Sequence, residues 1–217
     1  MWRGPVVTAV LATVLTGCSL ATEPEPVATA TLATKSPARN AEAKGATIGA
    51  SGSACELPVT FDVAEDWEPE AIESGTGDDA TGDAAELAEL LLTQGPVTAV
   101  CEIDAKPAGH LGFIRVWTGE PGEADERGVL AEFVAAEEGA RNSDERYSSF
   151  TTDGLTGTEV TYLHTSKLLD ETKKERAFAV TTPSGPVVVH LGGLDTEEHE
   201  AMLPAYELAK KTVRLGD

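Results

Sequence analysis

The sequence is poor in basic residues and in aromatic residues. Lys and Arg number 16 against 37 Asp and Glu, so the 217 residues carry a net charge of -21. A surface this acidic repels phosphate backbones and anionic headgroups, which excludes nucleic acid as a partner and electrostatic docking on a membrane. The two apolar stretches, near residues 10 and 90, are shorter than the ~20 residues that a membrane-spanning helix needs. The length leaves room for one ordinary domain with appendages.

The common catalytic motifs are absent as well. The chain has no Gly-x-Ser-x-Gly turn, no His-Glu-x-x-His helix and no glycine-rich phosphate loop. Its four histidines are spread out, and a single His on a strand is more often structural than catalytic. His190, Asp195 and His199 would form a metal site only if the loop between them folds back, and three ligands from one short stretch are a weak signal. We therefore assign no catalytic residue, no metal and no cofactor.

Residues 1–17 are typical of an export signal. Arg3 follows the amino terminus, and an apolar stretch runs from Pro5 to Leu15. The run Leu15-Thr16-Gly17-Cys18 resembles a bacterial lipobox, in which a signal peptidase cuts before the cysteine and the thiol receives a diacylglyceryl group. The alternative is an ordinary secretory signal with an incidental cysteine. Lipid chains on Cys18, palmitate among them, would hold the protein on the extracytoplasmic face of a bacterial cell membrane.

Residues 18–53 have the composition of a tether. They are mostly Ala, Thr, Ser, Pro, Gly and Glu, they contain no aromatic residue, and their charges balance. Such a segment buries too little apolar surface to offset the entropy of the chain, so we expect it to be disordered. The remaining residues, 54–217, are expected to fold as a single domain.

The cysteine count predicts one disulfide bond. With Cys18 acylated, Cys55 and Cys101 are the only pair left, and disulfides persist outside the cytoplasm. A bridge between them would close a loop of about 45 residues, which is worth ~4 kcal/mol in the chain-entropy model. A metal-binding pair is the alternative, but no histidine lies at a spacing typical of zinc sites.

Acidic residues are concentrated in the segment 62–89. No Lys or Arg occurs between Gly45 and Ala105, a stretch that holds fourteen acids. The simplest interpretation is a solvated loop that favours solubility. A site for cations or for a basic partner is the alternative, although Asp78 and Asp83 lack the alternating oxygens of an EF-hand loop. The sequence leaves this question open.

Hydrophobic periodicity predicts strands and helices throughout 54–217. The last helix is expected after Gly193, with Asp195 or Thr196 as its cap and with Pro204 either kinking it or marking its start. Short turns between neighbouring strands favour a mostly antiparallel sheet covered by helices on its faces, an α+β fold. The expected strands are 57–63, 97–103, 110–117, 157–164, 176–182 and 186–191, and the expected helices are 84–93, 124–138 and the long C-terminal one.

Several strings along the chain resemble one protein family. They are the lipobox, the Thr/Ala/Pro tether, the strand LPVTFDV followed by Trp67, then FAVTTPSG and GGLDTEEHEAMLPAYELAKKT, and a closing helix that ends in AKKTVRL. In this order, over residues 54–217, they resemble the PsbP-like lipoproteins of actinobacteria. The resemblance implies a PsbP-like α/β/α sandwich and a binding or accessory role, and it implies no reaction. The acidic insert after Trp67 departs from the compact pattern of the family.

The anchor, the tether and the missing motifs favour a non-catalytic binding or accessory lipoprotein of the cell envelope. Apart from the membrane, its expected partner is a protein, the cell wall or a small molecule. An envelope hydrolase or metal-dependent enzyme with an unrecognised site, using His190 or His199, is the alternative. Trp67 and Trp117 either line a cleft or belong to the core, and residue type alone does not decide between the two.

Overall fold

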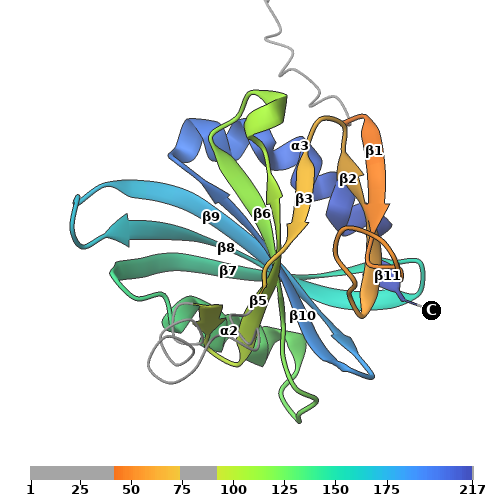
Figure 1. The fold of residues 1–217 in the computed structure, drawn as a ribbon. Coiled ribbons are helices and arrows are strands. Elements are labelled where there is room, and N and C mark those ends of the chain that lie inside the picture. The colour runs from red at the N-terminus through yellow and green to blue at the C-terminus, as the bar shows by residue number, and fades with distance from the viewer. Residues whose placement is uncertain (1–41, 74–91, 217) are drawn as a thin grey trace, which may run out of the picture. The chain divides into compact units, whose positions relative to one another are not determined.

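A computed structural model describes residues 42–73 and 92–216 of the chain. Within these residues, eight strands form one antiparallel sheet (Figure 1). Seven of them follow one another in the order β3 (Glu68–Ala71), β5 (Val97–Asp104), β6 (Gly112–Thr118), β10 (Gly185–Gly193), β9 (Thr172–Thr182), β8 (Leu155–Ser166) and β7 (Ala140–Thr152). The short β4 (Thr93–Gln94) also pairs with β5. A 3-10 turn, η1 (Lys106–Ala108), joins β5 to β6.

The same residues form a second, smaller antiparallel sheet. It has the order β1 (Lys44–Ile48), β2 (Val59–Ala64) and β11 (Arg214–Leu215). Helix α3 (Thr196–Thr212) packs against both β2 and the large sheet, whereas helix α2 (Glu126–Ala135) packs against β8 and β9 on the other face of the large sheet. The fold is therefore α+β with helices on both faces of an antiparallel sheet, which confirms the predicted class.

The core has two apolar layers, one on each face of the large sheet. Strand β10 is buried along its whole length, with Val188 in the α2 layer and Val187 and Val189 in the α3 layer. Burial on both faces explains why its sequence is a continuous apolar run rather than an alternating one. The neighbouring hairpin turn needs a glycine, because a Cβ on Gly185, whose φ is +115°, would lie 2.0 Å from the carbonyl oxygen of Gly119.

A bulge in β5 lets that strand contribute to both layers. Ala99 pairs with Trp117 and Cys101 pairs with Val116, so Val100 is an extra residue on β5. Without the bulge, Ala99 and Cys101 would share a face of the sheet. With it, Ala99 lies in the α2 layer and Cys101 in the α3 layer, where a disulfide partner can reach it.

Both helices begin at an aspartate. The carboxylate of Asp125 accepts a hydrogen bond from the backbone N–H of Gly128 at 2.7 Å, and that of Asp195 accepts one from Glu198 at 2.9 Å. Each bond satisfies a donor that the first turn of a helix leaves unpaired. Pro204 lies inside α3, so it neither starts nor ends this helix.

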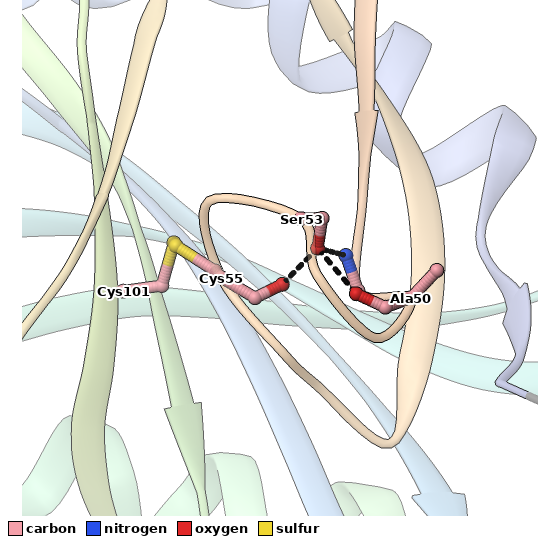
Figure 2. The surroundings of a disulfide bond; sticks show 5 residues. Ala50, Ser53, Cys55 and Cys101 are labelled. Atoms are coloured by element: carbon pink, nitrogen blue, oxygen red, sulfur yellow. Dashed lines mark hydrogen bonds between the residues drawn. A yellow bond between two sulfur atoms is a disulfide. The ribbon is translucent and has the colours of Figure 1, made fainter.

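Cys55 and Cys101 form the predicted disulfide, with their Cα atoms 6.0 Å apart. The bond joins the loop after β1 to the middle of β5, and Figure 2 shows how that loop is folded. The hydroxyl of Ser53 lies 2.6 Å from the carbonyl oxygens of Ala50 and Cys55 and accepts a hydrogen bond from Gly49 at 3.1 Å. The loop is thus held by its own hydrogen bonds as well as by the disulfide.

The predicted end of the tether at residue 53 is wrong. Residues Lys44–Ile48 form β1, which pairs with β2, and Ile48 is fully buried. The average composition of residues 18–53 gave no sign of this strand. β1 has only one large apolar residue, and its pairing with β2 supplies its hydrogen bonds. Cys18 and the rest of the predicted signal and tether, residues 1–41, lie outside the described residues, as does nearly all of the predicted helix 84–93.

Candidate ligand-binding groove

A groove lies on the face of the large sheet that carries α2. The ten residues of α2 make a helix about 15 Å long, whereas the eleven residues of β9 extend over roughly 36 Å. The helix therefore covers only part of the strands, and Figure 1 shows it at the bottom of the view, beside the lower end of β5. The part that α2 leaves uncovered contains a groove of about 700 Å³.

The strands become polar where α2 ends. On β10, Val188 lies in the apolar layer under α2, and His190 follows two residues later in the groove. On β9, Ala177 lies in the same layer, and Glu175 and Lys173 precede it in the groove. Because alternate residues of a strand share a face, these side chains line the floor of the groove in one row per strand.

Glu175 is the centre of a buried ionic cluster on this floor. It is 3% exposed, and its two carboxylate oxygens lie 2.9 Å from Nε2 of His190 and 2.7 Å from Nζ of Lys173. Lys173 also donates to the carbonyl oxygen of Gly193 at 2.7 Å. Burial by itself raises the pKa of a carboxyl group, but His190 and Lys173 outweigh it and hold the pKa of Glu175 below its ordinary value. Glu175 is therefore an anion with a partner on each oxygen.

Tyr162 connects this cluster to the residues that follow α2. Its hydroxyl donates to Oε1 of Glu137 at 3.0 Å and lies 3.4 Å from Nε2 of His190. The other oxygen of Glu137 lies 3.2 Å from Nδ1 of His164 and accepts from Nδ2 of Asn142 at 2.7 Å. Burial, reinforced by the nearby carboxylates, raises the pKa of Tyr162 well above its ordinary value, so the hydroxyl stays protonated. We call the connected residues Lys173, Glu175, His190, Tyr162, Glu137 and His164 the polar chain.

The wall of the groove beside this floor is aromatic and cationic, and it is formed by β6, the strand that pairs with β10. Phe113 and Trp117 lie on β6 on either side of Arg115, whose guanidinium carbon is 4.5 Å from the centre of the Phe113 ring and 5.8 Å from that of Trp117. Arg115 is also paired with Glu102. Gly192 makes room for the wall, because a Cβ there would lie 2.9 Å from ring atoms of Phe113. We call Phe113, Arg115 and Trp117 the aromatic wall.

The groove combines these two surfaces, and its described lining carries no hydroxyl or thiol nucleophile of a serine, threonine or cysteine. Across the described ranges, no group of three or more His, Cys, Asp or Glu residues could hold a metal ion. Nδ1 of His190 and Nε2 of His164 have no hydrogen-bond partner among the residues that the structure describes. These two nitrogens therefore remain available to a ligand.

The candidate metal cluster of the sequence analysis is not assembled. His190 faces α2, with its ring centre 5.7 Å from that of Phe133, whereas Asp195 caps α3 and His199 is buried in α3. Burial lowers the pKa of His199 to about 4, and its Nδ1 lacks a partner within the described part of the chain. His199 is a neutral core residue of α3 and does not meet His190 in a shared site.

Trp67 and Trp117 belong to the core. Trp67 and Trp117 are 5% and 4% exposed, and Trp67 lies in the α3 layer with its ring centre 6.5 Å from that of His110. Trp117 lies in the α2 layer and also lines the groove, so for this residue both interpretations hold. The acids Asp78 and Asp83 lie outside the described residues.

Sequence reasoning missed four members of the polar chain, namely Glu137, Tyr162, Lys173 and Glu175. The predicted strand starts at residue 176, whereas β9 starts at Thr172, so Lys173 and Glu175 fell outside it. A pattern was present, because Lys173 and Glu175 share a face with Ala177. Charges on the buried face of a strand indicate a polar site.

Comparison with known proteins identifies the family to which the chain belongs. The family model described as "Uncharacterised lipoprotein" matches residues 25–213, and the chain belongs to this family. It is thus a lipoprotein, associated with a membrane through a lipid anchor. In the described ranges no helix is both long and apolar enough to cross a membrane. No curated protein matches the sequence.

One solved structure shows the fold of this lipoprotein. The chain is similar to the solution structure of cyanobacterial PsbP (CyanoP) from Synechocystis sp. PCC 6803, with a TM-score of 0.52 and 9% sequence identity. The match covers 80% of this chain and 93% of that chain. At this identity the likeness shows a PsbP-like fold and nothing about the ligand.

Proposed function

We propose that the protein is a non-catalytic binding protein of the bacterial cell envelope. Lipid on Cys18 holds it at the extracytoplasmic face of the membrane, as its lipobox and its resemblance to actinobacterial lipoproteins suggest. The disulfide between Cys55 and Cys101 supports an oxidising compartment. In this proposal the groove beside α2 holds a small amphiphilic molecule.

The observation that carries the proposal is that the aromatic wall on β6 and the polar chain lie side by side in one groove. A volume of about 700 Å³ lies within the range of roughly 300–1,000 Å³ that small-molecule sites occupy. The members of the polar chain already hold one another in place, so a ligand need not order them. An apolar part of the ligand would lie on Phe113, and its hydroxyl groups would donate to the free ring nitrogens of His164 and His190.

Co-purification tests this proposal. The lipidated protein is purified from its own membranes in mild detergent, and a solvent extract of it is analysed by mass spectrometry. Glu138, which is exposed and lines the groove, is changed to Trp to narrow the groove. Glu132 is exposed on the outer side of α2 and is not a lining residue, so Glu132→Trp is the matched control.

The expected result is one small molecule in stoichiometric amount in the wild-type protein and in Glu132→Trp, and its loss from Glu138→Trp. Both variants should fold, because each change is made at an exposed position. A wild-type protein that carries only detergent and bulk lipid would contradict the proposal. So would equal occupancy in the two variants.

A hydrolase is the second candidate, because a carboxylate orients an imidazole at the floor of the groove. Glu175 and His190 are 2.9 Å apart, which is the geometry of a base and its orienting group. With no serine, threonine or cysteine among the described lining residues, such a base would act on water. The candidate predicts turnover of nitrophenyl esters that His190→Gln abolishes. Turnover that persists in His190→Gln excludes this residue as the base.

A further inference from the structure

Exposed leucines gather at one edge of the groove. Among the described residues the exposed large hydrophobic side chains are Leu111, Leu168, Leu169, Leu194 and Leu215. The backbone N–H of Leu194 donates to the carbonyl oxygen of Leu111 at 2.9 Å, which places these two side by side. Leu194 and Leu169 line a second hollow of about 510 Å³, and Leu168 precedes Leu169. We call Leu111, Leu168, Leu169 and Leu194 the leucine rim.

The leucine rim is continuous with the groove. Leu194, His164 and Lys173 line both the groove and the second hollow. The rim draws on three separate connections, which are the start of β6, the turn between β8 and β9, and the junction of β10 with α3. Its side chains are between 54% and 90% exposed, which is costly for leucine in water and calls for an apolar partner.

The described chain begins on the same side of the molecule. The carbonyl oxygen of Ala43 accepts from the backbone N–H of Glu65 at 2.8 Å, and Trp67 packs against His110, the residue before Leu111. Figure 1 shows β1 starting at the top of the view, where η1 and the N-terminal part of α3 also lie. The part of the leucine rim at Leu111 therefore lies toward the end of the domain at which residues 42 and 43 enter it, whereas the β8–β9 turn with Leu168 and Leu169 extends to the left edge of Figure 1.

The length of chain before residue 42 keeps this end close to the membrane. Cys18 and Glu42 are 24 residues apart, and a fully extended chain of that length spans at most ~85 Å. A lipid on Cys18 thus confines the domain to a thin layer above the bilayer, where even a weak surface contact is populated. The net charge of -21 disfavours electrostatic adhesion, so such a contact has to be apolar.

We propose that the leucine rim is a membrane-contact surface whose side chains enter the headgroup region of the bilayer that carries the anchor. The groove then opens toward the lipid surface, and its ligand arrives from the membrane interface rather than from bulk water. This inference rests on lipid attachment at Cys18, which belongs to the proposed function.

Site-specific labelling tests the inference on the intact lipidated protein. Leu169→Cys and, as matched control, Leu215→Cys are each labelled with the polarity-sensitive dye NBD. Leu215 is 47% exposed and pairs with Val59, whereas the tether enters beside Ala64 at the other end of β2. The native cysteines Cys55 and Cys101 are buried in a disulfide and do not react. The proteins are reconstituted in phosphatidylcholine vesicles with and without doxyl-labelled lipid.

The dye at position 169 should shift to the blue on the vesicles and be quenched by doxyl lipid several-fold more than the dye at position 215. If the dye is quenched equally at the two positions while the protein is bound to the vesicles, the leucine rim is not a membrane-contact surface. Lipid attachment at Cys18 would still stand. If the protein does not stay on the vesicles, it has no lipid anchor, and both the proposed anchor and this inference are wrong. A blue shift that depends on protein concentration and needs no lipid assigns the rim to a second copy of the chain, which also overturns the proposal.

Discussion

His199 shows how a single buried side chain makes stability depend on pH. Burial, with Arg176 and His190 nearby, lowers the pKa of His199 from 6.5 to about 4. Between these values an unfolded chain binds a proton that the folded protein excludes, so stability falls as pH falls from 6.5 toward 4. The carboxylate of Glu175, with a pKa below its ordinary 4.5, loses its contribution at still lower pH.

We predict that His199→Leu removes most of this pH dependence. Leucine cannot take up the proton, and it also removes the Nδ1 atom that has no partner in the described structure. Relative to pH 7, the wild-type protein should lose about 3 kcal/mol more stability at pH 4 than the variant, as measured by urea unfolding. Parallel stability curves for the two proteins would show that another group titrates.

Glu175 is the residue on which the polar chain depends. Its removal leaves Lys173 and His190 without the anion that both contact. We predict that Glu175→Gln lowers the free energy of unfolding by about 3 kcal/mol, because a half-broken buried ion pair costs more than the pair contributes. Glu171→Gln, at an exposed position near the start of β9, is the matched control and should change stability by less than about 0.5 kcal/mol.

At the scale of elements, strand β7 (Ala140–Thr152) could not be predicted from apolar alternation. Its thirteen residues are mostly exposed, and only Tyr147 and Phe150 are half-buried hydrophobic residues. It is nevertheless paired with β8 along its length, interrupted at Asp144, which has a φ of +56°. A strand at the edge of a sheet takes its hydrogen bonds from one neighbour, so its own sequence can stay polar.

Helix α2 and the inner strands were predictable because buried positions take apolar residues, and these positions recur at a spacing typical of a helix or a strand. The α2 residues Val129, Leu130, Phe133 and Val134 form the expected buried face, and β10 has the expected apolar run. The groove was not predictable, because its size depends on how far a ten-residue helix covers its sheet. The polar chain likewise joins β8, β9, β10 and the segment after α2, and only the strand order β10-β9-β8 brings these together.

The disulfide links the loop after β1 to strand β5. Cys55 and Cys101 are 46 residues apart, so the chain-entropy model gives a loss of ~4 kcal/mol when the bond is broken. We predict that Cys55→Ala with Cys101→Ala, or full reduction of the wild type, lowers the melting temperature by several degrees. A melting temperature unchanged by reductant would mean that the two thiols are unpaired in the native protein.

At the scale of the whole molecule, two electrostatic effects oppose each other. Ion pairs stabilise the surface, for example Arg141 with Asp170 at 3.2 Å. Each exposed pair is worth ~0–1 kcal/mol, and salt weakens it. The excess of 37 acids over 16 bases, by contrast, makes the folded protein repel itself. With so few bases available for pairing, we expect the repulsion to dominate.

We therefore predict that potassium chloride raises the melting temperature. Screening weakens both effects, but like-charged pairs outnumber oppositely charged pairs in this composition, so the net change is stabilising. Melting curves at low and at high salt, recorded at neutral pH where His199 is neutral, should differ by a few degrees in that direction. Magnesium chloride at equal ionic strength is the control, because screening by ionic strength alone predicts the same curve. A much larger rise with magnesium would point to a cation site in the acidic segment, and a fall with potassium would show that the ion pairs outweigh the excess charge.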